Sequence, residues 1–494
     1  MSLLALAPKK KLGRPPRFLL CHLGIVSGIL QARFVVSSVI EHKRRHGDRR
    51  APGRSAVKIT PRTFVIVTLL GGCLAISAPG VAAEKGDVTY YEHVLPILQN
   101  NCQSCHRPSG TNITGLVAPM SLMTYEETRP WARAIARKVE AREMPPWFLS
   151  APHGVFSNEK RLSNAEIDMI VAWVNAGATA GDMASGPEPL VFPEELNDGW
   201  TLGKPDFVVT MDQYTVTDDV YDLNISFRKL ITENEVPEDV WVQGWEFRAG
   251  SNGDRVHHFC SGVIAPGEDV APVIPGSDDT DNVRSSLGCM AAGAESTMLP
   301  DGFGLLIPKG STLSFSMHYN KEAGPGTSFQ NAAELGFFVA KTPPKHAVKY
   351  ARIANEGFEI PPHHPNYHVG SAWTLKKDIA LLTLWPHSHF RGKATRITAT
   401  YPDGREELLL DLPEWDQSWQ VTYKYREPKI LPMGTRIDVH WWFDNTVGRA
   451  ARYNLNPDRA VGDGPRTYDE MQRGFFTYAE LKSDAVSTTI GQQD

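Results

Sequence analysis

Long apolar runs are scarce in this sequence of 494 residues, and so are basic residues beyond position 83. The apolar stretches Phe18–Leu30 and Thr63–Ile76 are both short for a membrane span, which needs about 20 residues. Residues 1–62 hold 14 of the 51 Lys and Arg residues and only two of the 56 acidic residues, and residues 63–83 carry no charge. From Glu84 onward the net charge is therefore −17, which argues against a nucleic-acid partner.

The composition is that of a folded protein. With 41% hydrophobic and 22% charged residues the chain can bury cores, which excludes disordered and fibrous classes. The length allows two to four domains. The 41 Gly and 36 Pro residues favour turn-rich β-domains over a helical bundle.

Basic, apolar and small residues follow one another in the order of a secretory signal. Lys58 and Arg62 precede the apolar run Thr63–Ile76, and a short run of small residues ends at Ala83. We expect cleavage after Ala83 and export to the periplasm or an equivalent compartment. More than fifty residues precede the signal, and a start codon assigned too far upstream explains them most simply. A lipoprotein box ending at Cys73 is the alternative, but the apolar run continues past that residue.

The six cysteines divide into three pairs. Four of them fall in the N-terminal segment or in the motif described next: Cys21, Cys73, Cys102 and Cys105. Cys260 and Cys289 remain as one even pair. In an oxidising compartment this pair is expected to form a disulfide, and two buried thiols are the alternative.

Cys102, Cys105 and His106 form C-x-x-C-H, the attachment sequence of c-type haem. Two thiols one helical turn apart can bond the two vinyl groups of haem, and the next residue then points its imidazole at the iron. A zinc half-site would need a second Cys/His pair nearby, and none occurs before His153. A thioredoxin-like redox pair would need a βαβ setting, whereas the flanking residues have a helical pattern.

The residues on both sides of the motif predict helices. Four apolar residues lie at helical spacing just before it: Tyr91, Val94, Ile97 and Leu98. Farther on, Ser163 and Glu166 form a capping box that begins an amphipathic helix ending near Gly177. This arrangement resembles a small class I cytochrome c over residues 84–183.

The sixth iron ligand is expected between the two helices, where the candidates are Met120, Met123, Met144 and His153. Met144 precedes a Pro-Pro-Trp sequence and lies on a rigid, helix-free segment, a setting that suits an axial thioether. Met120 and Met123 lie nearer the motif, and a Met most often only packs in a core. We therefore predict that Met144 is the ligand.

Beyond a Pro- and Gly-rich linker over residues 184–196, the pattern changes to short β-branched and aromatic runs broken by turns. Phe207–Thr210, Leu313–Met317 and Arg436–Phe443 are examples. We expect two all-β jelly-roll or sandwich lobes after the small all-α haem domain. The expected bounds are 197–345 for the first lobe, 346–482 for the second and 483–494 for a tail.

The histidines of this β-region are grouped. His387 and His389 are two residues apart, so on a strand they would share a face and could chelate one ion. His257 and His258 are adjacent, and both can reach one ion only at a bulge or a twisted strand end. His318 follows an expected strand.

Four motifs in the same order resemble the copper type II, ascorbate-dependent monooxygenases, the family of dopamine β-monooxygenase and peptidylglycine α-hydroxylating monooxygenase. The motifs are His257-His258, Met317-His318-Tyr319-Asn320, His387-Ser388-His389 followed by Gly392-Lys393, and Asp469-Glu470-Met471. The resemblance covers most of residues 196–480. It implies two jelly-roll lobes that each hold one copper ion and face each other across an open cleft.

The same resemblance implies a role for each ligand set. His257, His258 and His318 would bind the electron-storing copper, and three imidazoles suit both Cu(I) and Cu(II). His387, His389 and Met471 would bind the copper that meets O₂, because a thioether favours Cu(I). The family reaction inserts one oxygen atom into a substrate C–H bond and needs two external electrons.

The function we expect is therefore an exported, copper-dependent monooxygenase that hydroxylates a small organic substrate with O₂. The fused cytochrome would supply electrons from a redox partner, in place of ascorbate or as a relay from it. The alternative is a non-catalytic haem electron-transfer or redox-sensing protein with β-sandwich binding lobes.

Several other residues compete for the copper roles, among them His440, Met433 and an expected loop group of His363, His364 and His368, and one residue departs from the family pattern. His440 has aromatic neighbours that suggest packing, and Met433 lies in an expected turn. The peptide-hydroxylating member of the family binds the carboxylate of its substrate through an Arg that lies two residues before the His-x-His pair. This sequence has Trp385 at that position. This difference favours an aromatic or apolar substrate.

Overall fold

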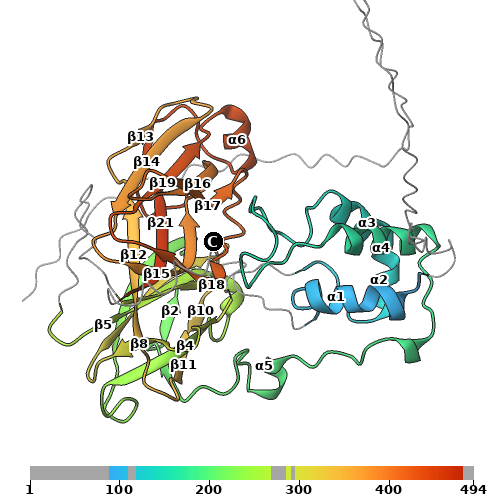
Figure 1. Ribbon diagram of the computed structural model, residues 1–494, viewed down its shortest axis with the longest axis horizontal. Helices are drawn as coiled ribbons and strands as arrows, with labels where there is room; N and C mark the ends of the chain where they lie inside the picture. Colours follow the sequence, from blue (N-terminus) through green and yellow to red (C-terminus); the bar gives the residue numbers. More distant parts are fainter. Residues whose placement is uncertain (1–87, 109–117, 269–284, 291–294, 482–494) are drawn as a thin grey trace, which may run out of the picture. The chain divides into compact units, whose positions relative to one another are not determined.

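The computed structural model describes residues 88–108, 118–268, 285–290 and 295–481, and Figure 1 labels the helices and strands of this part of the chain. The expected signal with its cleavage after Ala83, the cysteines Cys21 and Cys73, and the tail from residue 483 lie outside the described residues. Within the described ranges, no helix is long and apolar enough to cross a membrane.

The first part of the described chain is helical, as the sequence predicts. Its elements are η1 (Tyr90–Val94), α1 (Leu95–Asn101), α2 (Tyr125–Thr128), η2 (Arg129–Trp131), α3 (Ala132–Glu140) and α4 (Asn164–Asn175). Tyr90, Val94 and Leu98 recur at four-residue spacing and are buried. The capping box at α4 is present, because the Ser163 hydroxyl accepts a hydrogen bond from Glu166 N and the Glu166 carboxylate accepts one from Ser163 N.

The expected linker contains two short helical turns, η3 (Met183–Ser185) and α5 (Pro193–Leu196). The β-region then begins, and it contains two further short helical elements, η4 (Gly253–Arg255) and α6 (Val447–Arg452). We use "first lobe" for residues 207–339 and "second lobe" for residues 346–480.

The strands of the first lobe are β1 (Phe207–Thr210), β2 (Tyr214–Val216), β3 (Asp222–Leu230), β4 (Val240–Arg248), β5 (Val256–Ile264), β6 (Ser285–Met290), β7 (Thr297–Met298), β8 (Phe303–Ile307), β9 (Thr312–Asn320), β10 (Phe329–Asn331) and β11 (Glu334–Val339). Those of the second lobe are β12 (His346–Ala354), β13 (Glu359–Ile360), β14 (Tyr367–Thr374), β15 (Ile379–His387), β16 (Gly392–Thr400), β17 (Glu406–Leu412), β18 (Tyr423–Leu431), β19 (Arg436–Phe443), β20 (Val461–Gly462) and β21 (Arg473–Glu480). Alternate residues of β19 are buried, namely Ile437, Val439, Trp441 and Phe443, whereas β15 is buried along most of its length.

One sheet runs through both lobes. Its strand order is β1-β11-β4-β8-β12-β21-β15-β18, and the lobes join where β8 pairs in parallel with β12, His346 opposite Phe303. A four-stranded sheet, β3-β9-β5-β6, covers the first-lobe core, and another, β14-β19-β16-β17, belongs to the second. Ala380 and Leu382 of the second lobe belong to the first-lobe core, so the two lobes share packing as well as hydrogen bonds.

The turn between β15 and β16 is held by one buried carboxylate. Glu470 is fully buried and accepts hydrogen bonds from the Ser388 hydroxyl at 3.0 Å, His389 N at 3.0 Å and Arg391 N at 2.5 Å. Burial raises the pKa of Glu470 to about 7, although these donors oppose the shift. The turn that carries His389 is thus fixed by a residue about eighty positions later in the chain.

Replacing this carboxylate by an amide is expected to lower the free energy of unfolding by about 1–3 kcal/mol. In Glu470→Gln the side-chain NH₂ cannot accept, so at least one buried donor of the turn loses its partner. Glu480→Gln is the control, because Glu480 accepts from Lys349 and Lys377 near the surface, where an ion pair contributes about 0–1 kcal/mol. Urea denaturation measures the free energy of unfolding of both variants, and an equal decrease in Glu470→Gln and Glu480→Gln would contradict a special role for Glu470.

Candidate functional site

The C-x-x-C-H motif lies where α1 ends. Cys102 is the C-cap of α1, and the amides of Cys105 and His106 both donate to its carbonyl oxygen, at 3.1 and 2.9 Å. The three residues therefore form a single turn that brings the two thiols and the imidazole together. Both thiols are free, with Cys102 half-buried and Cys105 exposed.

The orientation of His106 fits an iron ligand. Its Nδ1 lies 3.1 Å from the carbonyl oxygen of Met120, which can only accept, so Nδ1 carries the proton and Nε2 is left as the ligand atom. Burial lowers the pKa of His106, which favours the neutral imidazole that a metal requires. The donor set thus fits covalent haem.

The candidates for the sixth ligand differ in their surroundings. Met144 follows α3, is 40% exposed and takes no part in the described helical core, whereas Met120 packs against that core. Met123 is half-buried. His153 is exposed and pairs with Glu159 at 2.7 Å. Met144 as axial ligand stays a prediction.

Three histidines of the first lobe meet at one point. His257 and His258 lie on β5 and His318 on β9, and one nitrogen from each ring lies within 4.8 Å of the others. The β5–β9 register shifts between Val256 and His258, so the expected irregularity at the adjacent pair is present. The Nδ1 atoms of His257 and His258 are 3.1 Å apart.

His318 presents an unused nitrogen to this cluster. Its Nε2 hydrogen-bonds to the carboxylate of Asp222 on β3, which fixes the tautomer, while its Nδ1 is buried without a hydrogen-bond partner in the described residues. An orphaned ring nitrogen beside two convergent imidazoles is the donor set of a three-histidine metal site. Burial, and then the neighbouring imidazoles, lower the pKa of His257 to about 4 and that of His258 well below its usual range. At neutral pH both rings are therefore uncharged and able to bind a metal.

A second imidazole pair lies at the end of β15. His387 is the last residue of the strand and His389 lies in the following turn, with ring centroids 5.3 Å apart. His387 ends the strand and His389 lies beyond it, so the pair is not contained in one regular strand, although the two rings are neighbours. Their Nδ1 atoms contact Gln420 Oε1 at 2.7 Å and the Asp469 carbonyl oxygen at 3.1 Å, which leaves both Nε2 atoms free. Burial lowers the pKa of His387 to about 4 and that of His389 well below its usual range.

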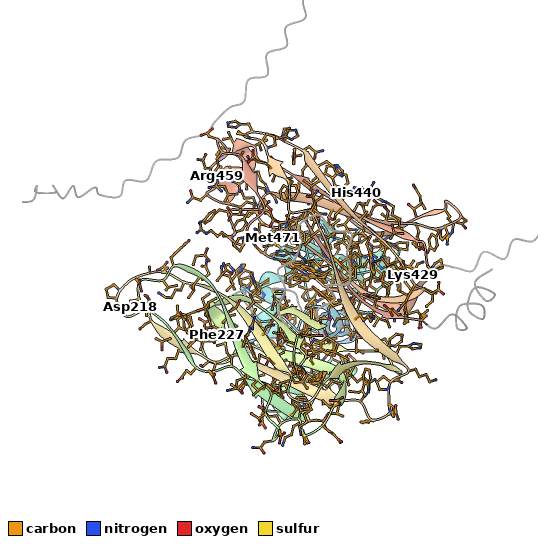
Figure 2. All side chains as sticks on the ribbon, turned by 90° about the vertical axis from the view of Figure 1, so that its left-hand side faces the viewer. Asp218, Phe227, Lys429, His440, Arg459 and Met471 are labelled. Atoms are coloured by element: carbon orange, nitrogen blue, oxygen red, sulfur yellow. A yellow bond between two sulfur atoms is a disulfide. The ribbon has the colours of Figure 1, made fainter. Side chains whose placement is uncertain are left out.

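Met471 follows Glu470 directly and precedes β21, two residues after the carbonyl group that orients His389. It is half-buried, and in Figure 2 it lies on the inner side of the second lobe, whereas His440 and Arg459 lie on its outer part. The segment that carries Met471 is thus tied to the His389 turn.

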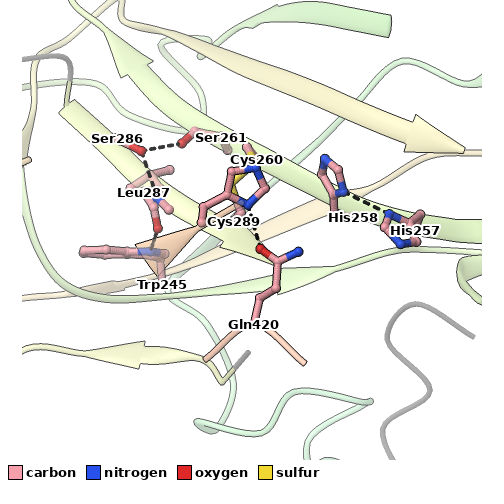
Figure 3. Close-up of a disulfide and its surroundings, with 11 residues drawn as sticks. Trp245, His257, His258, Cys260, Ser261, Ser286, Leu287, Cys289 and Gln420 are labelled. Carbon is pink, nitrogen blue, oxygen red and sulfur yellow. Dashed lines mark hydrogen bonds between the residues drawn. A yellow bond between two sulfur atoms is a disulfide. The ribbon is translucent and has the colours of Figure 1, made fainter. Parts of the chain in front are cut away.

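The two histidine clusters interact electrostatically across the lobes. Burial lowers the pKa of His258 most, followed by the two other histidines of its cluster, and His387 and His389 lower this pKa further. In the other direction, His257 contributes to the low pKa of His387. Figure 3 shows Gln420, which binds His387, in the same neighbourhood as His258 and the disulfide. Charge on one cluster therefore affects the other.

The expected disulfide is confirmed. Cys260 on β5 and Cys289 on β6 are directly opposed in the ladder and are bonded (Figure 3). The bond lies two residues from His258 and joins the bulged strand to the sheet edge.

The competing residues have other surroundings. His440 Nδ1 lies 3.0 Å from His368 Nε2, and the Met433 side chain is 61% exposed in a turn. Trp385 is buried and stacks on Phe475 with ring centroids 4.6 Å apart.

Comparison with known proteins identifies one part of the chain. Residues 96–177 match the family model of cytochrome c. A search of curated proteins finds no match.

The similar solved structures include an empty particle of Cowpea mosaic virus, with 6% identity and a TM-score of 0.25 over 56% of this chain and 91% of that one. Broad bean stain virus gives 11% identity and a TM-score of 0.23, over 49% and 76% of the two chains. Oxalate decarboxylase of Bacillus subtilis gives 8% and 0.11, over 59% and 85%. These TM-scores are too low to carry any argument about the lobes.

The helices, the C-x-x-C-H turn and the family match agree on one assignment. Such a domain carries covalent haem c and exchanges electrons with a redox partner. Residues 96–177 of this chain are a cytochrome c domain.

Proposed function

We propose that the protein is an exported copper-dependent monooxygenase whose cytochrome c domain supplies the electrons. The observation that carries the proposal is a pair of buried imidazole clusters, one on each lobe. Ring nitrogens of His257, His258 and His318 lie within 4.8 Å of one another, and the rings of His387 and His389 have centroids 5.3 Å apart. The order of the four motifs, given above, supports copper as the metal. The disulfide and the signal pattern support export to an oxidising compartment.

The residues that would hold the metal ions follow from the hydrogen bonds of the rings. At the first site these are His257, His258 and His318, the last through Nδ1, because Asp222 occupies its Nε2. At the second site they are His387 and His389 through Nε2, together with the thioether of Met471. When bound, copper supplies one-electron redox chemistry and activates O₂.

The surroundings of the second site bear on the substrate. Arg473 lies opposite His387 in the ladder, but it is buried and paired with Asp463 and Glu356. The charge of Arg473 is neutralised by its two carboxylate partners, and Trp385 is uncharged and stacks on Phe475. Neither side chain therefore offers a free positive charge to a substrate carboxylate. The proposal is therefore a small substrate that is bound through apolar contacts.

The metal content of the purified protein tests the proposal most directly. We expect one iron and two copper ions per chain by elemental analysis. The haem should stay with the polypeptide through acid-acetone extraction, because Cys102 and Cys105 hold it by thioether bonds. Iron without copper would refute the monooxygenase and favour the electron-transfer or redox-sensing alternative. In Cys102→Ser/Cys105→Ser any bound haem should extract freely.

Removal of the thioether should affect only the second copper site. In Met471→Ala the copper content should fall from two towards one per chain, while the fold persists, because a half-buried Met contributes little to a β-sandwich core. Met433→Ala is the control and should keep both ions, because its side chain is exposed. Full copper content in Met471→Ala would mean that Met471 only packs.

Removal of the Asp222 carboxylate should affect only the first site. Asp222→Ala frees Nε2 of His318, so the ring is no longer held in the tautomer that exposes Nδ1. Metal affinity at this site should fall by about 10–100-fold, the usual cost of losing such a partner. Titration calorimetry with the second site already filled measures this effect. An unchanged dissociation constant would show that Asp222 does not orient the ligand.

A further inference from the structure

A segment that belongs to the cytochrome c domain by chain order packs into the second lobe. Trp147, Leu149 and Phe156 are buried in the second-lobe core. Trp147 meets Tyr423 edge-on with ring centroids 5.2 Å apart, and Phe156 lies 4.9 Å from the ring of Tyr425. We call residues 147–158 the strap.

The strap is bound through its backbone as well. The amides of Ser150 and Ser157 donate to the carbonyl oxygens of Asp411 and Lys424, both at 2.8 Å. In return Arg426 N donates to the Val155 carbonyl oxygen at 3.0 Å. Phe156 and Tyr425 form an antiparallel bridge, so the strap lies along β18 as a short additional strand would.

The strap covers the β18 edge of the nine-stranded sheet. Strand β18 is the last strand of the nine-stranded sheet, and an uncovered edge leaves a row of backbone donors and acceptors unpaired. The Asn158 side chain completes the coverage, because it donates to the Thr422 carbonyl oxygen at 2.8 Å and accepts from Lys424 N at 3.1 Å. The strap thus satisfies groups that the second lobe alone would expose.

The ring contact between Trp147 and Tyr423 lies close in sequence to a proposed metal ligand on each side. On the strap side, Trp147 follows Met144, the expected axial ligand, after only two prolines. On the lobe side, Tyr423 follows Gln420 by three residues, and Gln420 is buried and bonded to His387 at 2.7 Å. The Trp147–Tyr423 ring contact therefore joins the segment of one ligand to the segment of another.

We propose that the strap docks the cytochrome c domain on the second lobe, and that Trp147, Tyr423 and Gln420 link the Met144 segment to His387 as the route for electrons. The proposal rests on the proposed function. Each transfer moves one electron, so that ferrous haem becomes ferric and a cupric ion at His387 and His389 becomes cuprous, with no bond or proton exchanged. Electrons would then reach the second site directly and not through His257.

The route is tested on the full chain carrying haem and Cu(II). After a one-electron reduction pulse without oxygen, haem absorbance should show first-order reoxidation at a rate independent of protein concentration. Trp147→Leu should slow this step by about 10-fold or more, since small displacements of reacting groups commonly cost that much, and Trp147→Phe should restore most of the rate. Trp373→Leu is the matched control, because Trp373 is equally buried in the same core but packs against Phe476 and Tyr478.

Equal slowing in Trp147→Leu and Trp373→Leu would overturn the route, because general loosening of the lobe would explain both. Slowing in His257→Ala with an unchanged rate in Trp147→Leu would overturn it in favour of the first site. If haem in the unaltered protein is not reoxidised at all, the proposed function fails as well.

Docking is tested separately, without copper, by hydrogen exchange. The amides of Ser150, Ser157 and Arg426 should be protected in the unaltered chain and in Trp147→Phe, and should exchange faster in Trp147→Leu. Rapid exchange of these amides in the unaltered chain would overturn docking, whatever the fate of the haem electrons. If these amides are protected in the unaltered chain but Trp147→Leu leaves the rate of haem reoxidation unchanged, the electron route is overturned while docking stands.

Discussion

The second imidazole pair depends on one buried carboxylate. Glu470 has no exposed surface, and it holds the turn after β15 through three donors, one of which is the backbone amide of His389. The preceding residue, Asp469, orients the His389 ring through its carbonyl oxygen, and the following residue is Met471. Three consecutive residues therefore fix the turn, the ring and the position of the thioether. This arrangement gives the Asp-Glu-Met motif a physical meaning beyond its resemblance.

The lobe junction provides the second constraint. Because β8 pairs with β12 and the first core includes residues of β15, the lobes cannot move apart without breaking a sheet and a core together. Each histidine cluster is therefore held within electrostatic reach of the other, and burial lowers the pKa of His258 and of His387. In the proposed function, this coupling means that charge gained at one site raises the cost of charge at the other.

Local patterns were sufficient to predict the parts of the structure that are held by local forces. The spacing of Tyr91 to Leu98, the Ser163 capping box and the irregularity at His257 each depend on neighbouring residues, and the structure contains all three. The partners of the ligand rings could not be predicted, because Asp222 lies 96 residues from His318 and Gln420 lies 33 from His387. The strap was missed for the same reason. Its alternating Trp147 and Leu149 suit a strand, but no local signal shows that its partner strand lies in another domain.

The hydrogen bonds of the rings also separate the two proposed sites in character. At the first site the Nδ1 atoms of His257 and His258 lie 3.1 Å apart, and Nδ1 is the nitrogen of His318 without a partner among the described residues. Because Nδ1 is the ring nitrogen nearer the backbone, a metal ion bound through these atoms would lie close to the β5–β9 ladder and its disulfide. At the second site Nδ1 is occupied by Gln420 and the Asp469 carbonyl oxygen, so the free Nε2 atoms project farther from the chain. A metal ion held close to a rigid sheet suits storage of an electron, because its ligands change little between charge states. In the proposed function, a metal ion held by projecting atoms and one flexible thioether would leave room for O₂ and substrate, and this agrees with the division of roles that the motifs imply.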